Sequence, residues 1–337
     1  MNLMVGDRAV ETYEIELDVS AAVPQADRCV VGCSIFLPPA PGPGPTVVVA
    51  LPGGSYNRRY WDMAPPGREV LSQARYFAQR GVGFCAVDYI GAAQESRPAD
   101  GDVMTMDVAA DAAHLAFQQL RDKFLSGAFG RAPLDEPTFV GMGQSMGGSM
   151  TIVQQGGHHD YAAIAPLGTS DSASKLLSFS GDALARWPEL STQERREVAR
   201  SWLESVLGEL PMYHETSRAL FSDAFFGPDP DPELVAYDEA TLQTMIPRSL
   251  SIDTATPAFL DPYIAAIECP VFLGFGDIEA KAREAHAQPA RYQASTDITL
   301  CVFPQMAHMH NHAPTRQLLW DRLLLWLETV TAESRTP

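Results

Sequence analysis

The sequence predicts an α/β protein whose central sheet is mostly parallel and covered by helices on both faces. Short apolar runs typical of buried strands alternate with segments of helical periodicity up to residue 170, and the rhythm resumes at residue 268. Between these parts, helical segments and proline-rich joints follow one another with no strand-like run. We therefore expect a core of residues 1–170 and 268–337 and an all-helical cap of residues 171–267.

The first half of the chain supplies most of the expected sheet. Residues 12–18 alternate apolar and acidic side chains, as in a half-solvated strand, whereas 46–51 form a continuous apolar run, as in a strand buried on both faces. Residues 83–89 are the next expected buried strand. The expected strands are 12–18, 33–37, 46–51, 83–89, 137–140 and 161–167, and the expected helices are 70–80, 106–124 and one starting near Ser149.

The second half begins with the cap, in which 195–207 has helical spacing and 227–232 is a proline-rich joint. Apolar runs at 270–275 and 298–303 then predict two more strands, and the amphipathic segment 315–330 predicts a closing helix. Sequential strands joined by helices favour parallel pairing, which places all the carboxyl ends at one edge of the sheet.

Composition narrows the classes of partner. The 337 residues are 46% hydrophobic and 20% charged, as in a globular protein with a large core. Lys and Arg number 24 against 42 Asp and Glu, a net charge of −18, which argues against nucleic acid and anionic membranes as partners. The N-terminus resembles no secretory signal, and no apolar run of about 20 residues predicts a membrane span. We expect a small-molecule substrate; the oligomeric state stays open.

The five cysteines predict neither a disulfide framework nor a zinc knuckle. They are odd in number and scattered, and only Cys29 and Cys33 are close, with three residues between them rather than the two of a redox motif. Free thiols indicate a reducing compartment, most simply the cytoplasm.

Residues 143–147, G-Q-S-M-G, match the G-x-S-x-G pattern of a nucleophile elbow. A serine on a tight strand-to-helix turn adopts a strained backbone conformation, so its neighbours two residues away must lack side chains. An expected strand precedes the motif and an apolar helical segment follows it, which is the context that the motif requires. Ser145 is therefore the candidate nucleophile.

A serine hydroxyl needs a base to take its proton, and the base needs a carboxylate to orient it. His308 follows the strand at 298–303 and precedes the last helix, so we assign it as the base. Asp277 ends the G-F-G-D segment after the strand at 270–275 and is the expected acid, with Glu279 and Asp171 as rivals.

Two further histidines lie beside the expected base. His310 and His312 complete the run H-M-H-N-H, but no acidic or cysteine residues accompany them in the sequence. We therefore expect loop residues here and no metal site.

The glycine pair at residues 53–54 predicts a site for an oxyanion. It follows the buried strand at 46–51 directly, where glycine leaves the backbone N–H groups approachable. The N–H of Gly54 or Ser55 would join that of Met146. Aromatic and basic residues come next: Tyr56 and Trp61 are expected to line the substrate pocket, with Arg58 or Arg59 available to an anionic substrate.

The order of glycine loop, serine, aspartate and histidine resembles the α/β-hydrolase family, and the resemblance covers nearly the whole chain. It implies Ser145 as nucleophile, His308 as base and Asp277 as orienting acid. Related enzymes often carry histidine before the glycines, where this chain has Pro52. Serine in the elbow, rather than aspartate, argues against the epoxide hydrolases and haloalkane dehalogenases of the same fold.

These assignments predict a serine hydrolase that needs no cofactor. It would cleave a carboxylic ester, or a thioester or lactone, through an acyl-enzyme, and the aromatic residues of the cap indicate a mid-sized hydrophobic substrate. Two alternatives stay open: an acyltransferase or cyclase that uses the same triad, and a ligand-binding protein without turnover. A lyase or cofactor-free oxygenase on this fold is a more distant one.

Overall fold

The computed structural model describes residues 10–24, 26, 28–39, 44–63, 65, 67–68, 71–170 and 186–333. Within them an eight-stranded sheet has the order β1-β2-β4-β3-β5-β6-β9-β10. The strands are β1 (Glu11–Asp18), β2 (Val30–Leu37), β3 (Thr46–Leu51), β4 (Gly83–Val87), β5 (Thr138–Gln144), β6 (Ala163–Leu167), β9 (Val271–Gly276) and β10 (Ile298–Phe303). Strand β2 pairs antiparallel with β1 and β4, and every later pair is parallel. The predicted mostly parallel α/β sheet is confirmed.

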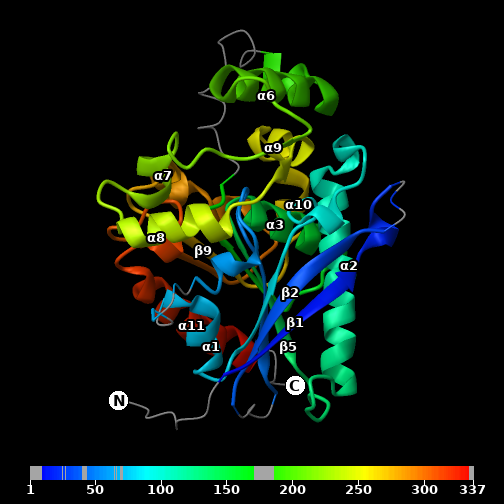
Figure 1. Cartoon of the computed structure of the whole chain (residues 1–337), viewed down its shortest axis with the longest axis vertical. Coiled ribbons are helices and arrows are strands. Elements are labelled where there is room, and N and C mark those ends of the chain that lie inside the picture. Colours follow the sequence, from blue (N-terminus) through cyan, green and yellow to red (C-terminus); the bar gives the residue numbers. More distant parts are fainter. Residues whose placement is uncertain are drawn as a thin grey trace.

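Helices cover both faces of the sheet, because β3 and its neighbours bury side chains on both sides. Val47 and Val49 join one buried cluster with the helices on one face, while Val48 and Ala50 join the other cluster. The first cluster contains α2 (Met106–Ser126) and α3 (Met146–His158), and the second contains α1 (Gln73–Ala78) and α11 (Arg316–Glu333). Figure 1 shows α2 on one side of the sheet and α1 with α11 on the other.

The helix α2 ends where its local sequence requires. The hydroxyl of Thr105 caps its first turn by accepting from the N–H of Val108, and Gly127 terminates it in the left-handed conformation, with φ of 82°. The helix α3 begins three residues earlier than the sequence indicated, at Met146 rather than near Ser149. The reason is that Ser145 is the single residue between the strand β5 and the helix α3.

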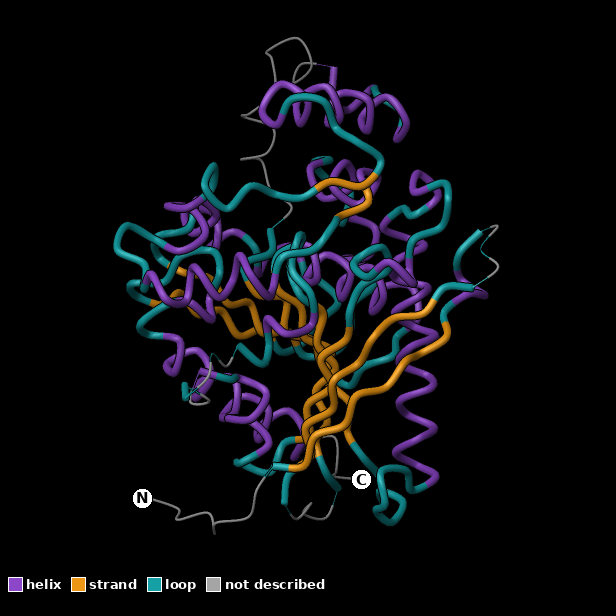
Figure 2. Tube along the Cα trace, viewed as in Figure 1, coloured by secondary structure: helices purple, strands orange, loops and turns teal. Residues whose placement is uncertain are grey.

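The insertion between β6 and β9 is helical, but not entirely. Its described helices are α6 (Thr192–Leu207), α7 (Ser222–Phe226), α8 (Pro232–Tyr237), α9 (Arg248–Ala255) and α10 (Asp261–Ala265). It also contains a two-stranded pair, β7 (Tyr213–His214) with β8 (Ile246–Pro247), which Figure 2 shows between α6 and the main sheet. Strands of two residues are too short to leave a periodic pattern, so the expectation of an all-helical insertion was wrong on this point.

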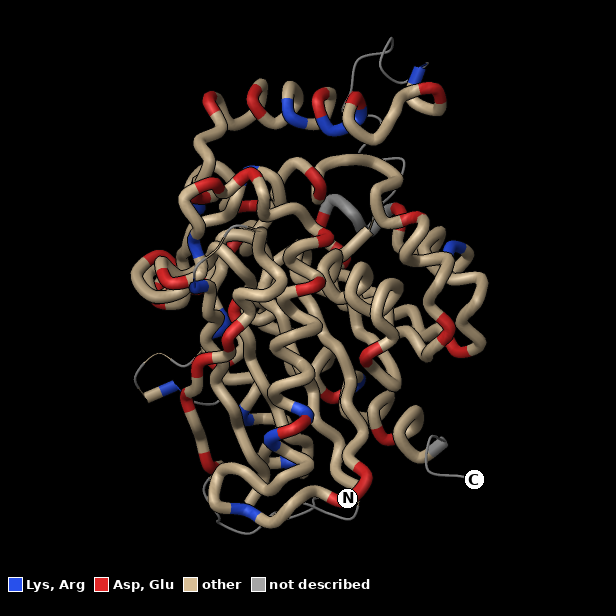
Figure 3. Tube along the Cα trace, turned by 90° about the vertical axis from the view of Figure 1, so that its right-hand side faces the viewer, with Lys and Arg blue, Asp and Glu red and all other residues tan. Residues whose placement is uncertain are grey.

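The helix α6 is largely polar and exposed. Ser191 and Glu194 form a reciprocal capping box at its start, and Ala199 is its only fully buried residue. Acidic and basic positions are interspersed along this helix, which lies at the top of the view in Figure 3. In the described part of the chain, no helix is long and apolar enough to cross a membrane.

Candidate active site

Ser145 occupies the sharp turn between β5 and α3, with φ of 54° and ψ of −117°. This conformation is costly for a residue with a side chain and needs support from its surroundings. The two motif glycines supply it by allowing close approach. A Cβ on Gly143 would lie 2.2 Å from the carbonyl oxygen of Gly147, and one on Gly147 would lie 2.3 Å from that of Leu51. The sequence pattern therefore has the steric cause that was expected.

Ser145, His308 and Glu279 form a continuous hydrogen-bonded relay. The Oγ atom of Ser145 lies 2.8 Å from Nε2 of His308, and Nδ1 of His308 lies 2.8 Å from Oε2 of Glu279. With its Nδ1 proton donated to the carboxylate, the imidazole presents an unprotonated Nε2 to the serine hydroxyl, which is the arrangement needed to accept a proton. Three residues far apart in sequence thus meet at the carboxyl ends of β5, β9 and β10.

Glu279 is held as a carboxylate in a nearly water-free position. Its side chain is 1% exposed, and Oε1 accepts the backbone N–H of Gly276 at 2.7 Å and lies 3.5 Å from Nε2 of His310. Burial acts to raise the pKa of Glu279, but the hydrogen bonds with His308 and His310 and the electrostatic attraction of these rings outweigh it, so the pKa falls below its ordinary range. The group is therefore ionised wherever His308 can act as a base.

The structure corrects the choice of acid, because Asp277 does not face the histidine. Asp277 is exposed, and its Oδ1 accepts the backbone N–H of Met306 at 3.3 Å. The chain turns after Gly276, so that Glu279, the rival in the sequence, returns beneath His308. The third candidate, Asp171, lies outside the described residues.

The turn after β3 presents Gly54 beside the elbow. A Cβ on Gly54 would lie 3.4 Å from Sδ of Met146, so the turn and the start of α3 are in contact. Met146 is the first residue of α3, whose N–H has no partner within the helix and lies at its positive end. Gly54 is partly exposed. The turn that carries Gly54 and the first residue of α3 therefore lie next to each other, beside Ser145, which is the arrangement that an oxyanion site requires.

Ser55 is not available as an oxyanion donor, although the sequence offered it as an alternative to Gly54. It is fully buried, and its N–H donates to the hydroxyl of Tyr89 at 3.1 Å. Its φ of 65° lies in the left-handed region. Nothing in the local sequence indicated this, because the partner Tyr89 comes from the end of a different strand.

The expected pocket residues Tyr56 and Trp61 lie in the core instead. Tyr56 is 0% and Trp61 1% exposed, and both pack in the cluster on the α1 and α11 face. Arg58 is likewise engaged, with Asp88 at 2.6 Å and Glu14 at 2.8 Å. Aromatic residues after a glycine loop are typical of core and pocket alike, so sequence could not separate the two.

Apolar residues of the insertion lie over the site. The ring of Phe225 is 6.1 Å from that of His308, centroid to centroid, and Phe221 stacks on Phe225 at 5.6 Å. On the other side, Cδ1 of Ile246 lies 3.2 Å from the position of a Cβ on Gly54. The backbone N–H of His308 donates to the carbonyl of Ala224 at 3.1 Å, which ties the loop of the base to α7.

The run H-M-H-N-H is built into the core. His310 and His312 are both buried; His310 lies by Glu279, and Nε2 of His312 is 2.9 Å from Oδ2 of Asp238. Among the residues that the structure describes, no group of three or more His, Cys, Asp and Glu side chains is arranged to hold a metal ion. In the sequence, the unused signal was the alternate spacing of His308, His310 and His312. In the structure, each of these rings lies near a carboxylate.

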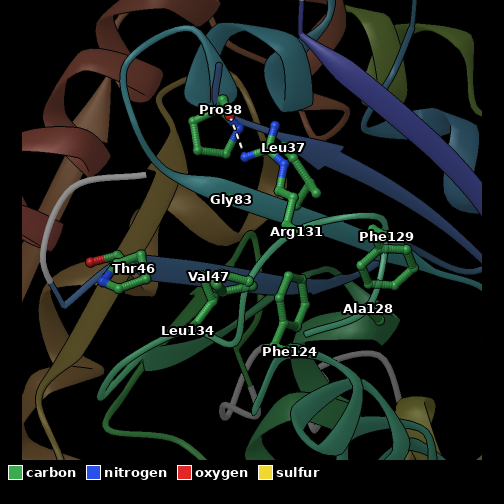
Figure 4. A pocket seen from close by; sticks show the side chains of 12 residues that line it. Leu37, Pro38, Thr46, Val47, Gly83, Phe124, Ala128, Phe129, Arg131 and Leu134 are labelled. Atoms are coloured by element: carbon green, nitrogen blue, oxygen red, sulfur yellow. Dashed lines mark hydrogen bonds between the residues drawn. The ribbon is translucent and has the colours of Figure 1, made fainter. Parts of the chain in front are cut away.

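A separate apolar pocket lies at the opposite edge of the sheet, near the amino ends of β3 and β4. Figure 4 shows Phe124, Phe129 and Leu134 around it, with Arg131 donating to the carbonyl of Pro38 at 2.7 Å. Its volume of about 20 Å³ has room for about one water molecule. A space of this size is too small for a substrate of several heavy atoms.

Comparison with known proteins identifies the family. Residues 48–319 match the model of the alpha/beta hydrolase family. The match spans most of the chain and includes Gly54, Ser145, Glu279 and His308, so this protein belongs to the alpha/beta hydrolase family. The resemblance drawn from the motifs is confirmed. A search of the curated proteins found no match.

Solved structures agree on the fold across nearly the whole chain. A thermostable carboxyl esterase from Bacillus coagulans superposes with a TM-score of 0.60 at 15% identity, covering 95% of this chain and 99% of its own. A thermophilic esterase from Thermogutta terrifontis gives 0.56 at 15%, covering 95% and 99%. A bromoperoxidase from Bacillus anthracis gives 0.59 at 16%, covering 94% and 100%. The family, with esterases among these structures, supports a hydrolase; the chemistry itself must be argued from the site.

Proposed function

We propose that this protein is a serine hydrolase that cleaves carboxylic esters through an acyl-enzyme. Ser145 is the nucleophile, His308 the base and Glu279 the orienting acid. The observation that carries the proposal is the relay of two 2.8 Å contacts that ends on a serine in the strained elbow. A ligand-binding protein would gain nothing from a base aligned on a strained serine hydroxyl.

The reaction follows from these positions. As Oγ of Ser145 attacks the ester carbonyl carbon, its proton moves to Nε2 of His308, and the carbonyl oxygen becomes an oxyanion that accepts from the N–H groups of Gly54 and Met146. The bond to the alcohol then breaks, and the alcohol leaves with the proton held by His308. Water repeats the sequence on the acyl-enzyme and releases the acid. Each backbone donor typically supports a factor of about 100 to 1,000 in rate.

We further propose that residues 171–267 act as a cap that selects a hydrophobic acyl or alcohol group. Support comes from Phe221, Phe225 and Ile246, which bring apolar surface over the base and over the turn of residues 53–56, here named the oxyanion turn. Thioesters and lactones present the same acyl carbon and belong in the assay. The cytoplasm remains the expected compartment, supported by five free cysteines.

Labelling with a fluorophosphonate probe tests the nucleophile. We expect labelling of the wild type at Ser145 and none of Ser145→Ala. Ser149→Ala is the matched control, since Ser149 is a buried serine one turn further along the same helix. Equal labelling of Ser145→Ala and the wild type would refute the assignment.

Product analysis separates hydrolysis from the related acyl chemistry. A panel of p-nitrophenyl esters of increasing acyl length, with thioesters and lactones, is incubated with the protein in the presence of added alcohols and amines. We expect the free acid as the main product. A transferred or cyclised acyl group as the main product would instead identify an acyltransferase or cyclase.

A further inference from the structure

The oxyanion turn contains a serine in a conformation that favours glycine. Ser55 has φ of 65°, and such a residue persists only where its surroundings hold it. Its N–H donates to Tyr89 at 3.1 Å, and its hydroxyl donates to the carbonyl of Thr244 at 3.0 Å and accepts the N–H of Thr216 at 3.1 Å. Its carbonyl accepts the N–H of Thr244 at 3.1 Å. Most of these partners come from the insertion.

Arg218 makes a charged contact with this turn. Its Nη2 donates to the carbonyl of Ser55 at 2.8 Å, while its guanidinium carbon lies 4.0 Å from the ring centroid of Tyr56. Arg218 is 3% exposed. The same guanidinium donates through Nε to Oδ1 of Asp238 at 2.7 Å, so its planar fork joins the turn to a carboxylate.

Asp238 is anchored in turn by the histidine loop. Its side chain is fully buried, and Oδ2 lies 2.9 Å from Nε2 of His312. Burial acts to raise the pKa of Asp238, but the hydrogen bond from His312 and the charge of Arg218 outweigh it, so the pKa is lowered and the carboxylate stays charged. A chain of contacts therefore runs from the loop that carries His308 to the oxyanion turn.

The held carbonyl determines where the oxyanion donor points. The N–H of Tyr56 donates to the carbonyl of Gly53 at 3.1 Å, which closes the turn across Gly54 and Ser55. Because the peptide bond is trans, the N–H of Gly54 points away from the carbonyl of Gly53 and out of the turn. The Ser55 carbonyl that Arg218 holds and the N–H of Tyr56 belong to the same peptide group. Rotation of this group would break the hydrogen bond from Tyr56 to the carbonyl of Gly53, and the N–H of Gly54 would then lose its fixed direction.

We propose that Arg218 is a positioning residue, through which the insertion holds the oxyanion turn in its reactive conformation. The inference rests on the proposed function for its effect on rate. By this proposal the insertion has a second function besides covering the substrate. Without the insertion, the core would contain the nucleophile and the base, but the N–H of Gly54 would not be held in position.

Arg218→Lys tests the proposal, because lysine keeps the charge beside Asp238 but lacks the fork that also reaches Ser55. The matched control is Arg196→Lys, since Arg196 is also an arginine of the insertion paired with a fully buried aspartate, Asp253, at 3.0 Å. With p-nitrophenyl butyrate, we expect kcat of Arg218→Lys to fall about 10- to 100-fold with KM changed less than about threefold, because the donor acts on the transition state. Arg196→Lys should stay within about twofold in both.

A second measurement reads the turn without relying on turnover. Hydrogen exchange of a peptide spanning residues 52–58 should accelerate in Arg218→Lys and not in Arg196→Lys. Unchanged kcat or unchanged exchange in Arg218→Lys would overturn the proposal, as would a rise in KM alone or equal losses in the two variants. If the wild type neither turns over esters nor reacts with a fluorophosphonate, the proposed function fails, and the exchange data still decide whether Arg218 holds the turn.

Discussion

Replacing Glu279 by glutamine tests the acid that the tertiary structure selected. The carboxylate oxygen Oε2 accepts from Nδ1 of His308 at 2.8 Å. In Glu279→Gln, an amide NH₂ facing the ring would force Nδ1 to become the acceptor. The proton would then lie on Nε2, and His308 could no longer take the proton of Ser145. The side chains are almost equal in volume, so the fold should be retained.

The expected loss follows from the charge and the tautomer. A carboxylate about 4 Å from a forming imidazolium is worth about 4 kcal/mol at an effective dielectric constant of 20, which is about a factor of 1,000 in rate. The site is well protected, since Glu279 is 1% exposed, and the wrong tautomer adds to the loss. We expect kcat on p-nitrophenyl butyrate to fall between about 1,000- and 10,000-fold, with KM nearly unchanged.

Asp277→Asn is the matched control, two residues away on the same loop. Asp277 is exposed and contacts the backbone of Met306 rather than His308, so its amide should leave kcat within about twofold. Steady-state kinetics of both variants at pH 8 give the comparison, and thermal melts confirm that both variants are folded. A folded Glu279→Gln with near wild-type kcat, or a large loss in Asp277→Asn alone, would refute the reasoning.

Two further changes probe packing and linkage. In Gly168→Ala, at φ of 57°, the new Cβ would lie 3.3 Å from the ring of His308, so we expect kcat to fall about tenfold. Gly130→Ala is the control, because its φ of 66° is similar but open space surrounds it, so it should lower stability alone. Equal kcat values in the two variants would contradict the packing argument. Burial raises the pKa of Asp253 to about 6, partly offset by Arg196, so the folded state binds more protons than the unfolded chain between about pH 4 and 6. The unfolding free energy of the wild type, relative to that of Asp253→Asn, should therefore fall by up to about 3 kcal/mol as the pH rises through this window. Urea titrations at pH 4, 5, 6 and 7 measure this difference between the two proteins. A difference that stays constant with pH would disprove the linkage.

Local rules account for what the sequence determined by itself. Apolar runs fixed the strands of the core because burial on both faces demands continuous apolar side chains, and the elbow was readable because close backbone contact at Gly143 and Gly147 admits only glycine. Ser145 was predicted from its place directly after a strand, and His308 from its place in the loop between a strand and the last helix. Each of these inferences depends on contacts within a few residues or on the shared edge of a parallel sheet.

The acid and the oxyanion turn needed the tertiary structure. Asp277 and Glu279 both follow β9 closely, and only the path of the loop decides which carboxylate returns to His308. Ser55 was a plausible donor until Tyr89, from the end of another strand, took its N–H. The direction of a side chain in a loop depends on distant partners, which leave no local pattern.

The insertion illustrates the same division. Its helical character was visible in sequence as the loss of the strand rhythm, yet its link to the site through Arg218 and Asp238 was not. A buried arginine and a buried aspartate look like surface charges in sequence, because only their pairing makes burial tolerable. Sequence therefore determined the main elements of the core and which serine and histidine meet, and the tertiary structure decided which charged groups hold them in place.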